Sequence, residues 1–467
     1  MAIQLRRMLG LRTIVSTSAG LAFAAMEYNI AAGLVGYVRG SDVWIATLVA
    51  GVIVLIVWAS FSELNGMFPT AAAIRLYMEK AMDKRIAFTI TFAYMLTIIL
   101  VIAADAFVIG SSMTFFFGGS QWGASLYILV ILGLATYVNL RGIKVAGWIQ
   151  DIATYTVLLV TVAIVLIGFL RHGFTVPANV HLGGSGGHVQ NLFEAVALAV
   201  FGYSAFEWVT TSAEEVRSPE LIPKGMLLAL GMLFIVFSAI SIGMSHFLTP
   251  AELATPYPQL FLAERCLGST GILIMMVVTA LTAVNTFNGG FITASRFIYA
   301  TAREGNLPTM FSSMNRHAVP YVAVWTLSLS SLVVAVILAL TGGWQVLVAV
   351  GAVLETMIYA VACYSVWKLR KRLPNQARPF RAPAVRFIAP FGIAVFTVLA
   401  VVAAVTVNNR VSIWPLSITL AGLAFSAVYV ILVMPKLRRK YEAQQASRRR
   451  RRPQPASPNP ILTDDGK

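Results

Sequence analysis

Glu27 is a carboxylate in the middle of an apolar run. It stands about 14 residues into the stretch from Thr13 to Val38, which corresponds to about 21 Å of helix. A bilayer has a hydrocarbon layer about 30 Å thick that does not solvate charge, so an ionisable residue at this depth is a candidate for a functional site. Glu27 could bind an ammonium group, or it could take and release a proton. Alternatively, it caps broken backbone of its own helix and touches no ligand.

A second polar interruption occupies residues 201–207, which read Phe-Gly-Tyr-Ser-Ala-Phe-Glu and follow an apolar run. Phe201 and Tyr203, which flank Gly202 and precede Ser204, could form an aromatic wall that attracts an amine by about 0.5–2 kcal/mol through cation–π contact. Ordinary packing is the competing interpretation for both rings. Glu207 could couple occupancy of a site to movement of its helix, or it could form a plain hydrogen bond to a neighbouring helix.

Further polar residues within apolar spans are Asp105, Asn285, Asn288 and Glu355. We expect some of them to join helices, where a polar contact contributes about 0.6 kcal/mol on average. Glu355 is preferred to Asp105 as an acid that faces a site. Tyr94 and Tyr359 are predicted to be core residues.

The elements that must position these residues are membrane-spanning helices. The chain has 467 residues, of which 58% are hydrophobic and 12% charged, a profile typical of a polytopic helical membrane protein. Alternating segments of a transmembrane barrel are absent from the sequence. We predict twelve spans, at 13–38, 43–66, 86–117, 124–140, 146–170, 191–212, 224–247, 271–302, 320–340, 345–367, 387–407 and 413–434.

The positive charge is distributed asymmetrically between the two sides of these spans. Of the 35 Lys and Arg residues, 31 fall on the side that carries both termini, and Arg39, Arg171, Arg265 and Arg410 fall on the other. The positive-inside rule therefore predicts cytoplasmic termini in a multi-pass protein of the cell membrane. The net charge of +16 thus indicates topology and not nucleic-acid binding. The basic tail 435–467 is predicted to be disordered, and it could contact anionic lipid.

Polar interruptions in the first and sixth spans indicate an inverted-repeat transporter. Paired breaks in corresponding helices of two halves are the sequence sign of a binding site near the membrane midplane. Unwound backbone is tolerated at that depth only where it lines a cavity or is buried in protein, so the two breaks should face each other. The predicted units are an arm at 1–12, a first repeat at 13–170, a second repeat at 191–367, two further helices at 387–434, and the tail.

Five loop motifs resemble the amino acid-polyamine-organocation permease superfamily, and in particular its amino acid permeases. They lie in the expected order at 62–70, 139–144, 213–219, 295–308 and 378–383, and the most specific is the segment Ser295-Arg296-Phe297-Ile298-Tyr299-Ala300-Thr301-Ala302-Arg303-Glu304-Gly305-Asn306-Leu307-Pro308. The resemblance implies a LeuT-type fold, all-α and membrane-integral, with twelve transmembrane helices, a five-plus-five inverted repeat, and breaks in helices 1 and 6.

The chain departs from this family at the break of helix 1. Alignment places the family's Gly-x-Gly, whose exposed amides suit a substrate carboxylate, on Ala24, Ala25 and Met26, and Glu27 follows. This change favours a cation that lacks a carboxylate, whereas family frequency favours an α-amino acid. Some proton-coupled members carry a lysine in helix 5, about fifteen residues after the glycine that precedes the loop lysine, and the nearest position here is Val157. The resemblance therefore does not extend to that coupling route.

We therefore predict a secondary active transporter that moves an amino acid by alternating access and is either proton-coupled or an exchanger. The predicted substrate-binding residues are Ala24, Ala25, Met26, Glu27, Phe201, Tyr203 and Ser204, and the predicted coupling or gating residues are Glu27, Glu207 and Glu355. A carrier of polyamines or other organic amines is the alternative, and a sensor that binds without transport is less favoured. A channel gives no reason for broken helices in inverted halves.

Enzymatic activity is not expected, because the sequence has neither a His-Glu-x-x-His motif nor a nucleophile elbow. It also has no phosphate-binding loop, so ATP is not expected to drive transport, and no cofactor or metal is predicted. Charged residues at the predicted cytoplasmic helix ends could form a gate of ion pairs, or they could be solvated surface charges. They are Glu214, Glu215, Arg217, Arg296 and Arg303.

Overall fold

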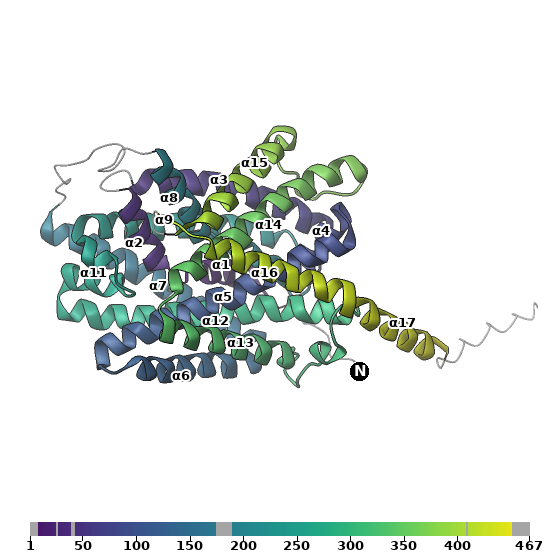
Figure 1. Cartoon of the computed structure of the whole chain (residues 1–467), viewed down its shortest axis with the longest axis horizontal. Helices are drawn as coiled ribbons and strands as arrows, with labels where there is room; N and C mark the ends of the chain where they lie inside the picture. Colours follow the sequence, from purple (N-terminus) through teal and green to yellow (C-terminus); the bar gives the residue numbers. More distant parts are fainter. Residues whose placement is uncertain (1–7, 25–26, 39–42, 174–188, 408–409, 451–467) are drawn as a thin grey trace, which may run out of the picture.

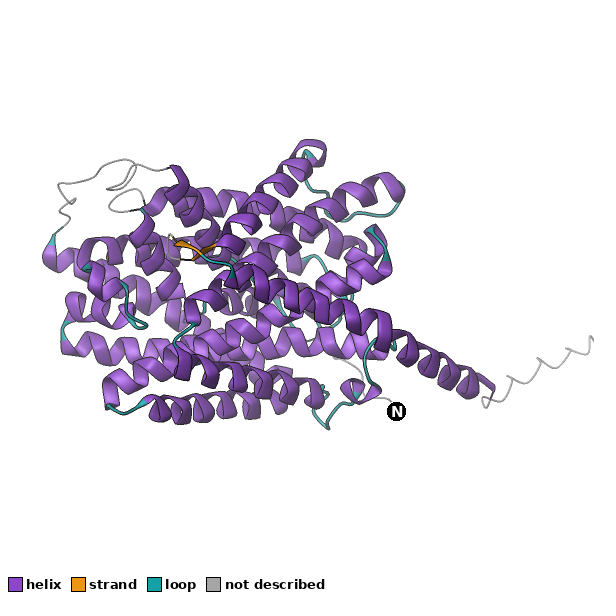
Figure 2. Cartoon of the chain, in the orientation of Figure 1, coloured by secondary structure: helices purple, strands orange, loops and turns teal. Residues whose placement is uncertain are grey.

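The computed structural model describes residues 8–24, 27–38, 43–173, 189–407 and 410–450. These residues are almost entirely helical, with one short pair of strands (Figure 2). Within them, eleven helices are long and apolar enough to cross a membrane, and a bent pair adds a twelfth span. The predicted fold class, an all-α membrane protein with twelve spans and breaks in helices 1 and 6, is confirmed.

The first five spans begin with a helix in two pieces. These pieces are α1 (Leu11–Ala22) and α2 (Glu27–Tyr37), whose axes differ in direction by 54°. The following elements are α3 (Val43–Met67), α4 (Ala73–Ala81), α5 (Lys84–Phe117), α6 (Gln121–Leu140) and α7 (Ile143–His172). All but the short α4 are of membrane-spanning length.

The next five spans repeat this pattern, again starting with an interrupted helix. The α-helix α8 (Val189–Gly202) gives way to the 3-10 helix η3 (Phe206–Ser212). The following elements are α9 (Leu221–Phe247), α10 (Pro250–Leu253), α11 (Pro258–Leu267), α12 (Ser269–Arg303), η4 (Thr309–Ser312), α13 (Tyr321–Thr341) and α14 (Trp344–Arg372).

The last two spans contain the only strand pair among the described residues. They comprise α15 (Val385–Val405), α16 (Trp414–Val428), the π-helical turn η5 (Tyr429–Val433) and α17 (Met434–Arg450). Between α15 and α16, strands β1 (Thr406–Val407) and β2 (Arg410–Val411) pair in antiparallel register.

The N-terminal end and α17 lie at the same end of the helical bundle, here called the terminal face (Figure 1). Helix α11 lies at the other end, here called the opposite face (Figure 1), and the short helix α10 contacts it. Leu9 forms a parallel bridge with Val216, and Tyr441 Oη donates a 2.7 Å hydrogen bond to the carbonyl of Arg303. Both ends of the described chain are therefore attached to the terminal face.

The outer surface of the bundle is apolar, as a membrane protein requires. Large side chains remain exposed along the spans, including Leu170 at 84% and Trp122 at 71%. Exposed apolar patches of this extent are rare on soluble monomers. The spans therefore cover a buried core and present their outer sides to lipid.

The structure adds three short helices to the predicted loops and alters the predicted tail. Helices α4, α10 and α11 were not predicted, because none has an apolar run of membrane length. The tail was expected to be disordered from residue 435, but α17 is helical to Arg450. That expectation was wrong for this segment, which is rich in strong helix formers and is held by Tyr441. Residues 451–467 lie outside the described part.

Candidate functional site

The two broken helices meet at their interruptions. Helix α2 contacts α8, and α1 contacts η3, so each half of the first span lies against one half of the sixth. Ser18 Oγ in α1 donates a 2.7 Å hydrogen bond to the carbonyl of Phe206. Across the gap, a Cβ built on Gly202 would lie 3.3 Å from Glu27 Oε2. The carboxylate of the first break is thus beside the glycine of the second.

Glu27 lies in the first turn of α2 and is 2% exposed. A carboxylate in that position is favoured by the positive end of the helix dipole. Asp105 of α5, which is fully buried, is near enough for its charge to act on Glu27. Of the remaining residues expected here, Ala24 is buried, whereas Ala25 and Met26 lie outside the described residues. The sequence prediction treated Asp105 as the less favoured acid, and the structure places it near this break.

The aromatic residues of the helix 6 interruption point to neighbouring helices. Phe201 packs closely against Gly351 of α14, because a Cβ on that glycine would lie 2.7 Å from Phe201 Cζ. Tyr203 Oη donates to the carbonyl of Thr47 at 3.4 Å, and its ring meets Phe237 edge-on. Ser204 is 5% exposed. The described contacts of both rings are thus to other helices, and Gly202, which has no side chain, is the residue of this break that lies beside Glu27.

Two carboxylates and two tyrosines form a buried cluster on the terminal side of the breaks. Tyr94 Oη of α5 lies within hydrogen-bond distance of Glu207 Oε1 and 2.8 Å from Glu355 Oε1. Tyr359 Oη donates to Glu207 Oε2 at 3.1 Å. All four side chains are essentially inaccessible. The cluster joins η3 to α5 and α14, and so ties the terminal half of the sixth span to the third and tenth.

The cluster has too few hydrogen-bond donors to stabilise the ionised form of both carboxyl groups. A tyrosine hydroxyl carries one proton, so Tyr94 can donate to only one of its two carboxyl neighbours. Two carboxylates that share a site repel each other, which favours a bound proton on one of them. Glu355 Oε2 has no hydrogen-bond partner among the described residues. This arrangement can hold a proton between Glu207 and Glu355.

Ala205 marks the strained point of the helix 6 break. Its φ of 68° lies in the left-handed region, which residues with a Cβ seldom adopt. Its backbone N–H donates to Glu355 Oε1 at 3.3 Å. Glu355 of α14 therefore contacts both the tyrosine of the cluster and the backbone of the break.

The terminal half of the first span is attached to α7 by a carboxylate. Asp151 Oδ2 lies 3.1 Å from Arg12 Nε and accepts from Thr13 Oγ1 at 3.3 Å. Ser16 Oγ donates to the other oxygen of Asp151. Asp151 is buried, with 7% of its surface exposed. Three side chains of α1 therefore converge on one buried acid.

A chain of amides extends this attachment to α12 and α6. Gln150 Nε2 donates to the carbonyl of Ser16 at 3.2 Å and its Oε1 accepts from Asn288 Nδ2 at 2.8 Å. Asn288 Oδ1 accepts in turn from Asn139 Nδ2 at 2.8 Å. Asn285, also of α12, accepts from Thr154 Oγ1 at 2.9 Å. Asn285 and Asn288 thus join helices, one of the roles considered from the sequence.

The gate residues expected from the sequence form two ion pairs at the terminal face. Glu215 and Arg296 pair through two contacts, one of them 3.3 Å long, and both side chains are at most 3% exposed. Glu214 and Arg303 pair at 2.7 Å in a more accessible position. Burial raises the pKa of Glu214, but hydrogen bonds from Arg303 and from the backbone N–H of Ala71 outweigh it and leave the pKa below its usual value. Arg217 contributes its backbone, whose N–H donates to Leu9.

Among the described residues, no group of three or more His, Cys, Asp or Glu side chains could hold a metal ion.

The sequence interpretation missed the part that Tyr94 and Tyr359 play beside the two acids, and it did not single out Asp151. A usable signal was present for the tyrosines, since a phenol buried in an apolar span needs a hydrogen-bond partner. The available partners in the same layer are the buried acids.

Comparison with known proteins identifies related chains along most of the sequence. A family model described as amino acid permease matches residues 14–448. The aromatic amino acid transport protein AroP of Corynebacterium glutamicum is 27% identical over 394 residues, covering 78% of this chain and 82% of its own. An uncharacterized amino acid permease, YvbW of Bacillus subtilis, is 24% identical over 73% of this chain and 78% of its own. A D-serine/D-alanine/glycine transporter of Escherichia coli is 24% identical over 58% and 61%, respectively.

Proposed function

Because this chain belongs to the amino acid permease family, we propose that it carries an amino acid across the cell membrane by alternating access. The observation that supports this function is the meeting of two broken, buried helices, with Glu27 beside Gly202. Broken helices of this kind leave backbone groups and a charge available to a ligand at membrane depth. The substrate ammonium would bind to Glu27, near Ala24 to Met26, and close to Phe201, Tyr203 and Ser204.

We further propose that transport is coupled to protons through Glu207 and Glu355. The buried cluster with Tyr94 can hold one proton between two carboxyl groups, and Glu355 also accepts from the N–H of Ala205 in the break. Release of that proton would place two negative charges together and weaken the connection between η3, α5 and α14. Proton loss and opening of the terminal side would then occur together.

An organic-amine carrier is the second candidate for the transported class. It is favoured by Glu27, whose carboxylate lies in the first turn of α2, where other members of the family would present bare amides to a substrate carboxylate. Asp105 adds a second acid close to that position. Two acids near one break suit a ligand with an ammonium group and no carboxylate of its own.

Uptake by purified protein in liposomes tests the first proposal. Glu27→Gln should abolish uptake of the amino acid or its pH dependence, while the protein remains folded and monodisperse. Glu252→Gln, at an acid of α10 that pairs with Arg265 away from both breaks, is the matched control and should transport normally. Near-normal flux of Glu27→Gln at every pH would remove Glu27 from the mechanism, and saturable binding without flux in the unmodified protein would indicate a sensor.

Competition separates the two substrate classes. If an amine is carried, putrescine or a decarboxylated amino acid should inhibit uptake as effectively as the parent amino acid. If an amino acid is carried, these amines should compete weakly. The comparison uses the same liposomes with and without a pH gradient, so it also reports whether protons drive the flux.

We propose that the terminal face is cytoplasmic, with the basic tail against anionic lipid. The excess of Lys and Arg on that side supports this orientation. Cys266 and Cys363 are both buried, so thiols introduced at the surface can be followed against a low background. A cysteine at the exposed Val411 should react with an impermeant reagent on intact cells, and one at the exposed Ser447 should not. The reverse pattern would invert the proposed topology.

A further inference from the structure

Polar side chains at the terminal end of α3 are buried without hydrogen-bond partners. Ser62 and Asn65 are fully buried, and neither Ser62 Oγ nor Asn65 Nδ2 has a partner among the described residues. Thr70 Oγ1, in the loop between α3 and α4, also lacks one within the described part of the chain. A buried polar group without a partner is costly, and groups of this kind are normally satisfied by internal water. The end of α3 therefore offers positions at which water can be held.

A line of side-chain oxygens connects Asn65 to the helix 6 break. Tyr77 Oη of α4 donates to Asn65 Oδ1 at 3.3 Å, and the hydroxyl of Thr210 in η3 is close enough to act on that phenol. Thr210 Oγ1 donates in turn to the carbonyl of Glu207 at 2.7 Å. Glu207 and Thr210 are three residues apart in a 3-10 helix, so their side chains lie on the same side of it. Polar groups therefore follow one another from Glu207 to the amide of Asn65.

Helix α4 is well placed to carry this connection. It contacts α5, α14 and η3, the three elements that supply the buried cluster of acids and tyrosines. Tyr77 is fully buried, and its ring meets Phe61 of α3 edge-on. Arg75 is two residues away, roughly on the other side of α4, where it pairs with Glu79 and Glu304. The hydroxyl of Tyr77, and not the guanidinium of Arg75, therefore faces η3.

The connection approaches solvent beside the accessible ion pair of the terminal face. Thr70 is followed by Ala71, whose backbone N–H donates to Glu214 Oε1 at 3.0 Å. The side chains of Glu214 and its partner Arg303 are 24% and 45% exposed. Glu63, the acid within α3 at this end, is buried and held by two arginines. Water can therefore meet the polar groups of the loop next to Glu214.

The connection lies on a different side of η3 from the first span. Ser18 of α1 donates to the carbonyl of Phe206, at the start of η3, whereas Thr210 is directed to α4. A substrate that passed between α1 and η3 would not have to pass Tyr77. The two routes to the terminal face are therefore separate.

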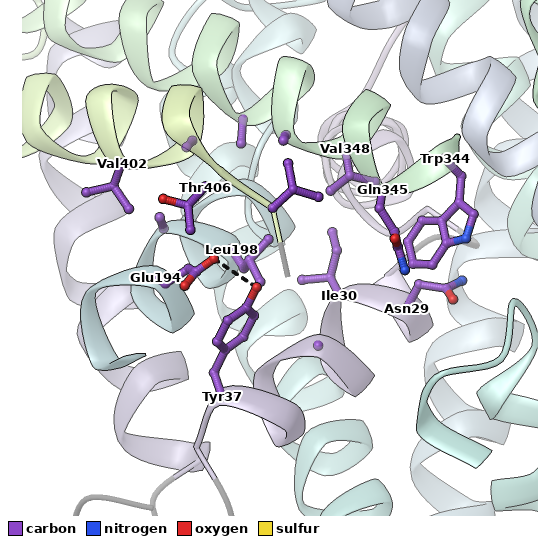
Figure 3. Close-up of a pocket in the computed structure, with 16 residues that line it drawn as sticks. Asn29, Ile30, Tyr37, Glu194, Leu198, Trp344, Gln345, Val348, Val402 and Thr406 are labelled. Carbon is purple, nitrogen blue, oxygen red and sulfur yellow. Dashed lines mark hydrogen bonds between the residues drawn. The ribbon is translucent and has the colours of Figure 1, made fainter. Parts of the chain in front are cut away.

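Two cavities lie on the other side of the break. One, of about 80 Å³, is bounded by α2, α8, α14 and the end of α15, and its lining includes Asn29, Trp344 and Ala349 (Figure 3). The second, of about 250 Å³, shares Asn29 and Trp344 and extends to α10. Both lie along α2, which runs from Glu27 toward the opposite face. A proton that leaves the cluster toward the terminal face therefore needs a route outside these cavities.

From this geometry we infer that the proton shared by the two acids of the cluster leaves for the terminal face along Thr210, Tyr77 and Asn65, by a water-lined route separate from that of the substrate. The inference rests on the proposed function and names the path by which its proton is released. The O–H bond of the protonated carboxyl breaks, the electron pair stays on the carboxylate, and a neighbouring water accepts the proton. Each hydroxyl of the route accepts one proton and gives up another, while Asn65 holds a water between them. Water at the terminal face finally takes the proton as hydronium.

Infrared spectroscopy of the detergent-purified protein tests the route without any substrate. A protonated carboxyl group absorbs apart from amide and carboxylate groups, and the band of the cluster is identified by its loss in Glu355→Gln. On transfer to D₂O the band shifts as a deuteron replaces the proton, so the rate of this shift measures how fast protons reach the cluster. Tyr77→Phe should slow the exchange about tenfold, the effect on a rate of one lost hydrogen bond.

Variants along the route should act alike, whereas a phenol elsewhere on the terminal side should not. Asn65→Leu and Thr210→Val replace polar atoms by apolar ones of similar size and should slow the exchange by a similar factor. Tyr429→Phe, which removes a 2.9 Å hydrogen bond to the carbonyl of Asn306, should leave the rate unchanged. A loosened fold would speed the exchange, so a folding defect cannot imitate the expected slowing.

The outcomes distinguish failure of this inference from failure of the proposed function. Absence of the band at every pH would show that the cluster holds no proton, and would overturn both the proposed coupling and the route. A band that exchanges equally fast in Tyr77→Phe and in the unmodified protein would leave the coupling intact and overturn the route alone.

Transport in liposomes tests whether the proton and the substrate use separate routes. Without a pH gradient, external tritiated solutes exchange for internal unlabelled ones with no net release of protons. With a mixture of the standard amino acids and putrescine as the probe, Tyr77→Phe should leave this exchange unchanged. Loss of the exchange in parallel with the slower infrared shift would overturn the separation of the two routes.

Discussion

The two faces of the bundle are closed by different means. On the terminal side, acids and bases from distant helices pair with one another, as in Glu215 with Arg296 and Glu63 with both Arg370 and Arg378. The buried Arg75 adds two more pairs, one with Glu79 and one with the accessible Glu304. On the opposite side, the ion pair found among the described residues is the accessible one between Arg265 and Glu252.

The opposite side has cavities where the terminal side has ion pairs. Two cavities of about 80 and 250 Å³ lie along α2, and they are lined mainly by small, apolar and amide side chains. This difference indicates which contacts a change of access must break. If the chain works by the proposed alternating access, opening of the terminal side would separate buried charges, whereas the opposite side already has cavities.

Removing a base from the deeply buried pair of Glu215 and Arg296 should have the largest effect. Arg296→Ala leaves Glu215 as a buried charge without its partner, which is expected to destabilise the protein by about 3–5 kcal/mol. Thermal unfolding of the detergent-purified protein measures this loss. The double variant Glu215→Gln with Arg296→Met removes both charges and should recover much of the stability. If Arg296→Ala melts like the unmodified protein, the terminal face is not held by this pair.

Removing the phenol between the two acids should affect transport more than folding. Tyr94→Phe deletes the hydroxyl within reach of Glu207 and Glu355, a hydrogen bond to charged groups worth about 1.5–3 kcal/mol, so uptake should fall about 10- to 100-fold. Uptake at several pH values should also show an altered pH dependence. Tyr429→Phe, which removes a 2.9 Å hydrogen bond to the carbonyl of Asn306, is the matched control. Equal losses in the two variants would argue against a special role for the cluster.

Loosening the first span should make the terminal side more accessible by a smaller factor. Asp151→Asn removes the charge that binds Arg12 and Ser16 and should increase labelling of a cysteine at the partly buried Thr13 about threefold to tenfold, or ~0.7–1.4 kcal/mol. A cysteine at Ala349 on the opposite side should label at an unchanged rate. Acceleration at both positions would indicate general loosening instead of opening at one face.

The accessible pair at the terminal face should matter least. Arg303→Ala removes the partner of Glu214 and should cost about 0–1 kcal/mol at pH 7. Because the pKa of Glu214 is lowered in the folded protein, its contribution is complete above the usual glutamate pKa of about 4.3 and is lost as the pH falls through the lower folded value. The difference in melting temperature between the variant and the unmodified protein should therefore shrink below about pH 4. A difference that grows on acidification would contradict the pairing.

The spans and the two breaks could be predicted because hydrocarbon imposes simple rules. A helix must remain apolar for about 20 residues to cross it, so interruptions such as those at Glu27 and at 201–207 are conspicuous. The sequence motifs also indicated the family, and charged residues at the predicted cytoplasmic helix ends suggested a gate of ion pairs as one of two interpretations. Short amphipathic helices such as α4 and α11 lack this signal and were predicted as loops.

Contacts between spans were harder to predict, because they depend on how each helix is rotated. A helix that is apolar on all sides gives little indication of which side faces a neighbour, so the meeting of Tyr94 with Glu207 and Glu355 was not foreseen. Glu194 and Gln345 lie near the ends of their helices, where polar residues are common. They share a cavity only because α2, α8 and α14 surround the same space.

The left-handed backbone at Ala205 also has an energetic consequence for helix 6. Holding a residue that has a side chain in that conformation costs on the order of 1–3 kcal/mol of backbone strain. The carboxyl of Glu355 restrains it through the N–H of Ala205. When that restraint is released, the stored energy becomes available to the next conformation, and 1.4 kcal/mol is about a tenfold change in an equilibrium. A glycine at this position would adopt the same backbone conformation with little strain, so little energy would be released.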